Sequence, residues 1–172
     1  MTLVSVEEYL NTSFQDGDRE YLDGRLVEVN VGDVFHGDLQ GSIVVRLRAA
    51  YPRFWTAPAV LVQVKRTRFR IPDVVVVAGP MPAGPVITAP PLVAIEILSP
   101  TDRAEELQEK IDEYLAFGIP CVWVVNPRTR RGYLYTADGM REAKDGILRT
   151  ADPAIELPLA EVFPAPQPGS LP

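Results

Sequence analysis

Short runs of β-branched and other apolar residues alternate with turn residues along the chain, which is typical of a protein with several short buried strands. The most apolar runs cover residues 74–77, 92–98 and 121–125. Between the last two, apolar residues recur at helical spacing over residues 104–115. A strand, a helix and a second strand in this order predict a βαβ-like unit over residues 92–125.

Two helices and a hairpin are predicted before this unit. A short amphipathic helix is expected over residues 6–14. Asp23-Gly24 favours the positive φ angles of a tight turn and therefore predicts a β-hairpin over residues 19–29. A helix capped by Asp33 follows and extends to about residue 50. Four apolar residues at helical spacing form its predicted buried stripe: Leu39, Ile43, Val44 and Leu47.

The remaining segments predict further strands and turns. Residues 55–64 and 65–69 predict two strands, or one long bent strand. Prolines and glycines mark residues 79–91 as a loop, and Asp-Gly pairs mark turns in a meander near the C-terminus. Hairpins on both sides of the βαβ-like unit predict an α/β fold with antiparallel additions, whose sheet is parallel or mixed.

The composition excludes several classes of protein. No apolar run reaches the roughly 18 residues of a membrane span, and no basic segment followed by an apolar one marks a signal peptide, so a cytoplasmic location is expected. The single cysteine, Cys121, excludes an internal disulfide and a Cys-rich zinc site. The net charge of −6 argues against a surface broadly coated by nucleic acid, so any DNA contact is expected to be local.

Two acidic residues lie in or against the apolar runs. Asp73 directly precedes the run at residues 74–77, and Glu96 lies between Ile95 and Ile97. A buried carboxylate needs a hydrogen bond, a base or a metal. Mg²⁺ prefers oxygen ligands and is usually held by one or two carboxylates plus water and phosphate. We therefore predict a divalent-cation site formed by Asp73, Glu96 and the carbonyl of Ile97; alternatively, Asp73 is a solvated or turn-capping residue.

Lys110 is the third candidate for this site. It lies on the flank of the apolar stripe of the helix after Glu96, with Glu106 four residues earlier. One interpretation is an ordinary surface ion pair between Glu106 and Lys110. The other is a compact positive charge that orients an attacking water or stabilises a phosphorane-like transition state.

Other charged residues are candidates for supporting roles. On a strand, Arg66, Arg68 and Arg70 would share one face and could bind DNA phosphates beside the metal. Alternatively, they protect a solvated edge strand against aggregation. His36, the only histidine, is a helix-start residue or an outer site residue, and Glu20 is an exposed strand residue or a further acid of the site.

Several of these residues belong to a recognisable combination of motifs. The combination consists of residues 20–27 (EYLDGRLV), His36, residues 71–74 (IPDV), residues 96–101 (EILSPT), Glu106, Lys110 and residues 118–127 (GIPCVWVVNP). With these motifs the chain resembles the Uma family of restriction-endonuclease-like proteins, within the PD-(D/E)XK nuclease superfamily. The resemblance extends from about Val6 to Tyr135.

The resemblance implies a fold and a set of site residues. The implied fold is a central mixed β-sheet flanked by helices, in one restriction-endonuclease-like domain over residues 1–164 followed by a Pro-rich tail at 165–172. Asp73 matches the first acid of the superfamily and Glu96 the second. Leu98 replaces the usual lysine two residues after the second acid, and Lys110 matches the place of the family's lysine on the following helix.

The implied activity is cleavage of DNA phosphodiester bonds with Mg²⁺, for which Mn²⁺ would substitute. A homodimer is expected, because nucleases that cut both strands often pair symmetrically, and no membrane is involved. Two alternatives stay open. The acidic net charge and the absent lysine beside Glu96 suit an inactive nucleic-acid-binding or assembly module with the nuclease fold. A phosphodiesterase for a small substrate is the other.

Overall fold

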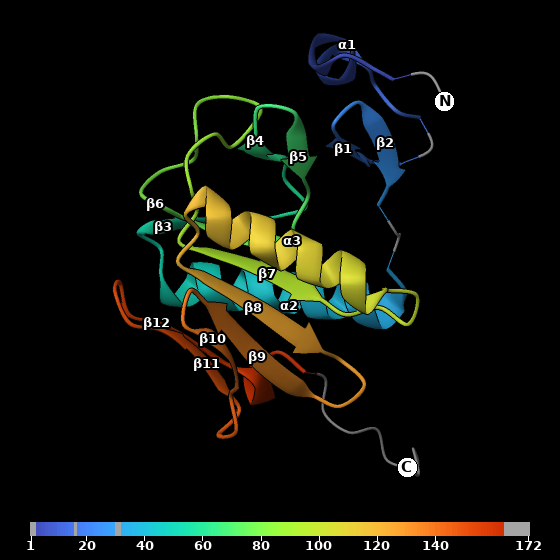
Figure 1. Cartoon of the computed structure of the whole chain (residues 1–172). Coiled ribbons are helices and arrows are strands. Elements are labelled where there is room, and N and C mark those ends of the chain that lie inside the picture. Colours follow the sequence, from blue (N-terminus) through green and yellow to red (C-terminus); the bar gives the residue numbers. More distant parts are fainter. Residues whose placement is uncertain (1–2, 16, 30–31, 164–172) are drawn as a thin grey trace.

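In the computed structural model, which describes residues 3–15, 17–29 and 32–163, a six-stranded mixed sheet forms the centre of the molecule (Figure 1). Its strands, in spatial order, are β10 (Gly139–Glu142), β9 (Arg131–Thr136), β8 (Cys121–Asn126), β7 (Val93–Ile97), β6 (Val74–Ala78) and β3 (Phe54–Pro58). β7 and β8 are parallel and the other neighbours are antiparallel. The α/β fold with a mixed sheet is therefore confirmed.

One long helix covers each face of this sheet: α3 (Ala104–Phe117) lies in front of it in Figure 1 and α2 (Val34–Ala50) behind it. α3 connects the parallel strands β7 and β8, so the predicted βαβ unit is present. The predicted buried stripe of α2 is confirmed in all four positions, because Leu39, Ile43, Val44 and Leu47 are buried against the strands. α3 buries Ile111 and Tyr114 on the opposite face of the sheet.

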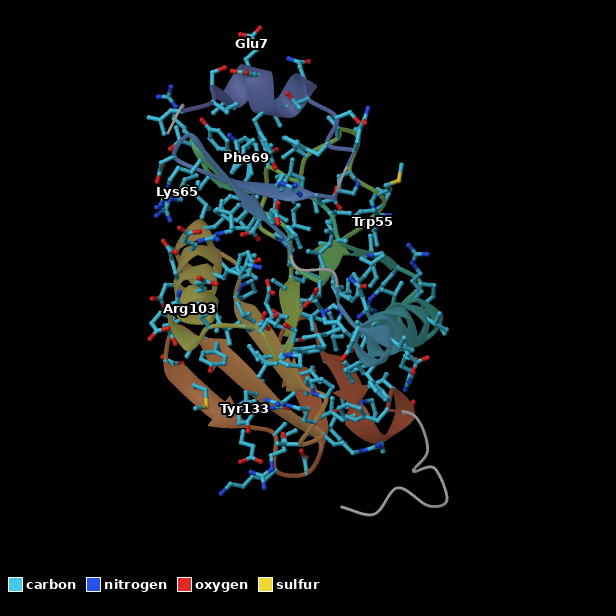
Figure 2. All side chains as sticks on the ribbon, turned by 90° about the vertical axis from the view of Figure 1, so that its right-hand side faces the viewer. Glu7, Trp55, Lys65, Phe69, Arg103 and Tyr133 are labelled. Atoms are coloured by element: carbon cyan, nitrogen blue, oxygen red, sulfur yellow. The ribbon has the colours of Figure 1, made fainter. Side chains whose placement is uncertain are left out.

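A smaller antiparallel sheet lies above the central one in Figure 1. It consists of β2 (Arg25–Glu28), β1 (Arg19–Leu22), β5 (Arg68–Arg70) and β4 (Val62–Lys65), in this spatial order. β1 and β2 form the predicted hairpin. The short helix α1 (Val6–Asn11) packs onto this sheet through an aromatic cluster of Tyr9, Tyr21 and Phe69, the last of which is labelled in Figure 2.

The C-terminal strands extend the core on the α2 side. β11 (Ile147–Thr150) and β12 (Ile155–Pro158) form a hairpin that is followed by the 3₁₀ turn η1 (Leu159–Glu161). Leu148, Leu157 and Leu159 are buried with the α2 face of the central sheet. The predicted tail at 165–172 lies outside the described residues. Within the described ranges, no helix combines the length and apolar character that crossing a membrane requires.

Three sequence predictions differ from the structure. The helix predicted over residues 6–14 ends at Asn11. The strand predicted from residue 55 ends at Pro58, where Ala59 adopts a positive φ of 46° and breaks the extended backbone. Residues 65–69 are not one strand, because Arg66 lies in the turn between β4 and β5. The prediction that Arg66, Arg68 and Arg70 share one strand face is therefore wrong.

Candidate active site

The strand register places the two predicted acids beside each other. β6 and β7 are antiparallel, with Val74 opposite Ile95. One step along this register puts Asp73 opposite Glu96. Side chains of directly opposed residues lie on the same face, with Cβ atoms about 5 Å apart. Ala94, two residues before Glu96, belongs to the core under α3, so Glu96 also faces α3.

Both carboxylate oxygens of Asp73 are held by neighbouring groups. Oδ2 accepts a hydrogen bond from the backbone N–H of Ile97 at 2.6 Å. Oδ1 lies 3.1 Å from Nε2 of His36 on the first turn of α2. The side-chain amide of Gln40, one helical turn later, donates to the Asp73 carbonyl at 2.8 Å. α2 therefore fixes Asp73 through both its side chain and its backbone.

Glu96 is 6% exposed and is held from α3. Its Oε1 accepts a hydrogen bond from the hydroxyl of Tyr114 at 2.7 Å, and its Oε2 lies 3.5 Å from Nζ of Lys110. Lys110 and Tyr114 are four residues apart and therefore occupy the same face of the helix. Lys110 thus brings an ammonium group to Glu96, although Leu98 stands two residues after this acid.

Glu20 on β1 connects Lys110 to the small sheet. Its Oε1 lies 3.1 Å from Nζ of Lys110 and accepts the backbone N–H of Ile71 at 3.0 Å. Its Oε2 accepts from NH1 of Arg70 at 2.8 Å. The carboxylate is 3% exposed, so burial makes these contacts stronger than the same contacts in water.

Arg70 and Arg68 of β5 face carboxylates of α3. Nε of Arg70 donates to Glu113 at 2.6 Å, and its NH2 lies 3.4 Å from Glu109. Arg68 contacts Glu113 and also lies 2.8 Å from Glu109. Because Arg70 is 3% exposed and surrounded by acids, its positive charge is balanced by carboxylates inside the protein. This network joins α3 to the small sheet.

A cavity of about 280 Å³ is lined by seven of the nine candidate site residues. They are Glu20, His36, Arg70, Asp73, Glu96, Ile97 and Lys110. Arg66 and Arg68 do not line it, and Glu106, which does, makes a 3.9 Å ion pair with Arg103. The structure thus brings the two acids and the lysine to one cavity and leaves two of the three predicted phosphate contacts outside it.

The surroundings of Glu96 raise its pKa to about 7. Burial is the largest cause, and the charge of Asp73 adds to it, whereas Lys110 and the Tyr114 hydrogen bond oppose it. For Lys110, burial lowers the pKa, but the charges of Glu96 and Glu20 outweigh this and raise the pKa above its ordinary value. Lys110 therefore stays charged at neutral pH. The hydrogen bond to Asp73 raises the pKa of His36.

Tyr114 and Glu113 contact candidate residues of the cavity, and the sequence does not predict these contacts. Tyr114 falls within the apolar helical pattern predicted over residues 104–115, and this pattern gives no role to its hydroxyl. A signal was present, because Tyr114 stands four residues after Lys110 and so faces the same way. Glu113 carried no signal, because its partners on β5 are more than 40 residues earlier in the chain.

The chemistry of the donor set fits a hard divalent cation with few protein ligands. In the described part of the chain, no group of three or more His, Cys, Asp or Glu side chains is arranged to hold a metal ion. Mg²⁺ does not need such a cage, because it usually keeps several waters and binds one or two carboxylates. Asp73 and Glu96 supply two neighbouring carboxylates; burial is the main cause of the raised pKa of Glu96, and the charge of Asp73, which a cation would offset, adds to it.

Comparison with solved structures supports the fold. The structure resembles a crystal structure described as "a putative nuclease belonging to DUF820" from Anabaena variabilis ATCC 29413, with a TM-score of 0.80. The alignment covers 93% of this chain and 97% of the other at 16% sequence identity. At this identity the likeness establishes the fold alone. No protein with a curated description matches the chain.

The family comparison covers nearly the whole sequence. A family model described as "Uma2: Putative restriction endonuclease" matches residues 6–164. This range includes every candidate residue of the cavity, from Glu20 to Lys110. Because the match spans most of the 172 residues, the chain belongs to the Uma2 family, as its motifs indicated.

Proposed function

We propose that this protein is a Mg²⁺-dependent nuclease that hydrolyses DNA phosphodiester bonds in the cavity between α2, α3 and the small sheet. The observation that carries the proposal is that Asp73, Glu96 and Lys110, from three separate segments, line this one cavity. Membership of the Uma2 family supports the same reaction class.

Asp73 and Glu96 would hold the ion, with the carbonyl of Ile97 as a further ligand. Mg²⁺ held there would activate a water for attack and would neutralise charge that develops on the phosphodiester. His36 and the Ile97 amide fix the orientation of the Asp73 carboxylate. Tyr114 fixes that of Glu96. Neither carboxylate then has to reorganise when the ion and the substrate arrive.

Lys110 acts as a positive charge in this proposal. Its raised pKa keeps the ammonium protonated, so it is a poor general base and a good partner for an anionic transition state. Glu20 holds it in place through a 3.1 Å contact. Glu20 is therefore a positioning residue, itself fixed by Arg70 and the Ile71 amide.

The test is cleavage of single-stranded and duplex DNA with Mg²⁺ or Mn²⁺ by the wild-type protein and by Asp73→Ala and Glu96→Ala variants. We expect each substitution to abolish cleavage, while circular dichroism shows an intact fold. Asp138→Ala, at an exposed turn outside the cavity, is the matched control. Wild-type cleavage rates in both cavity variants would reject the proposal.

Lys110→Met separates binding from catalysis. If the lysine stabilises the transition state, the cleavage rate should fall much more than the Mn²⁺ affinity. Calorimetric titration of the same variant measures the affinity directly. A parallel fall in both quantities would mean that Lys110 serves only to maintain the cation site.

A binding or assembly module with the same fold is the second candidate. It is favoured by the engagement of Lys110 with both Glu20 and Glu96, which leaves no lysine of the cavity free for substrate. Calorimetry with Mn²⁺ distinguishes the two functions, because a module without a cation site would show no binding. A competition assay between DNA and small nucleotide diesters tests the phosphodiesterase alternative.

A further inference from the structure

Besides His36, four arginine and lysine side chains line the cavity, and they fall into two pairs. Arg70 and Lys110 lie inside and form ion pairs with the carboxylates of Glu20, Glu96 and Glu113. Arg25 and Arg103 also line the cavity but are exposed to solvent. The cavity therefore has acids and engaged cations within it and exposed arginines at its surface.

Neither exposed arginine is firmly paired. Arg25 is the first residue of β2, directly after the β1–β2 turn. Within the described ranges it makes no ion pair. Arg103 lies 3.9 Å from Glu106, and the two side chains are 73% and 69% exposed. Such an exposed pair contributes at most about 1 kcal/mol and is screened by salt. Both guanidinium groups are thus available to an external anion.

The two arginines come from different sides of the cavity. Arg25 belongs to β2, the edge strand of the small sheet, and Arg103 directly precedes α3. Figure 2 shows Arg103 at the side of α3, below the small sheet that carries Phe69. Asp73 and Glu96 line the same cavity. An exposed arginine of β2 and one directly before α3 therefore line the same cavity as the two acids.

We propose that Arg25 and Arg103 bind the phosphates that flank the reacting phosphate of a single-stranded DNA segment. This inference rests on the proposed nuclease function. It replaces the phosphate contacts predicted for Arg66, Arg68 and Arg70. Arg66 lies in the β4–β5 turn outside the cavity, and the other two are engaged by carboxylates.

The charge of the cavity lining is the reason to choose a single strand. Seven acidic residues line it, against four arginine and lysine residues and His36: Glu20, Glu28, Asp73, Glu96, Asp102, Glu106 and Glu109 against Arg25, His36, Arg70, Arg103 and Lys110. A duplex would bring a second row of phosphates toward this acidic surface, where no further free arginine lines the cavity among the described residues. One strand needs only the two available contacts.

The test measures binding without requiring cleavage. Fluorescence anisotropy of an end-labelled single-stranded DNA oligonucleotide, with EDTA and separately with Ca²⁺, is recorded against salt concentration. Arg25→Ala and Arg103→Ala should each weaken binding about three- to fivefold, as expected for an exposed ion pair. Each should lower the slope of log K against log salt by about 0.7, the value for one single-strand phosphate contact. Arg25→Lys and Arg103→Lys should retain the slope, because the charge remains.

Arg66→Ala and Arg128→Ala are the matched controls, since both arginines are exposed and neither lines the cavity. Their affinities should stay within about twofold of the wild-type value. An unchanged slope in the Arg25→Ala/Arg103→Ala double variant, an equal loss in Arg66→Ala, or a wild-type protein that binds no single strand would overturn the inference. A wild-type protein that binds with the expected slope but never cuts would reject the nuclease proposal and support these contacts.

Discussion

Glu96 is the carboxyl of the candidate site whose surroundings raise its pKa into the neutral range. Its pKa in the folded protein is about 7, above the ordinary value of 4.5, chiefly because burial disfavours the carboxylate. Between these two values the folded protein binds more protons at this position than the unfolded chain does. The contribution of Glu96 to stability is therefore greatest at low pH and is lost as the pH rises through about 7.

A cation that binds Glu96 must displace this proton, which predicts a pH-dependent affinity. The apparent Mn²⁺ affinity should fall about tenfold for each unit of pH below about 7 and level off above it. Titration calorimetry across this pH range measures the effect. Glu96→Gln should lose both the binding and the pH dependence. An affinity that is independent of pH would contradict the assignment of Glu96 as a ligand.

The Tyr114 hydroxyl makes a second prediction at this scale. Its hydrogen bond stabilises the ionised form of Glu96 and lowers the pKa of that carboxyl. In Tyr114→Phe the pKa of Glu96 should rise further, so the acidic limb of the pH–rate profile should move to higher pH. Tyr133→Phe, on β9 and without this contact, should leave the profile in place. A profile that moves to lower pH in Tyr114→Phe would show that the bond has another role.

At the scale of elements, α3 holds the site together. Its Lys110 and Tyr114 contact Glu96, and its Glu113 contacts both arginines of β5. The same helix thus fixes the central sheet and the small sheet relative to each other. Removing one member of a buried ion pair leaves an uncompensated charge, which is far more costly than losing an exposed pair.

Glu113→Ala should therefore destabilise the protein by about 3 kcal/mol or more. Glu109→Ala is the matched control, because Glu109 also contacts Arg68 and Arg70 but has a side chain that is 49% exposed. Its loss should cost less than about 1 kcal/mol. Urea unfolding of both variants gives the two values. Equal destabilisation would show that Arg70 is satisfied by solvent when Glu113 is absent.

Elements whose pattern is complete within a short stretch were predicted well. The buried stripe of α2 and the Asp23-Gly24 hairpin depend on spacing and turn chemistry within the element itself. The β3 end at Pro58 was missed, because the positive φ of Ala59 has no signature in that residue type. Local patterns thus determined which elements form, and some boundaries depended on backbone conformations that the residue types do not reveal.

At the scale of the whole molecule, the site depends on contacts between distant segments. The sequence predicted that Asp73 and Glu96 share one cation site, and the β6–β7 register places them opposite each other. It did not predict that Arg70 pairs with Glu20 and Glu113, which lie 50 and 43 residues away in the sequence. From the sequence alone, each arginine near the acid motifs was an equal candidate for a phosphate contact. The fold shows which of them are paired with carboxylates and which are free.

The cation site is the claim on which the proposed function depends most directly. The decisive measurement is the anomalous difference density of a crystal soaked in Mn²⁺. The account predicts one peak in the cavity within coordination distance of both Asp73 and Glu96, and its loss in Glu96→Gln. A well-diffracting soaked crystal without a peak there, or with Mn²⁺ bound only at other carboxylates, would contradict it.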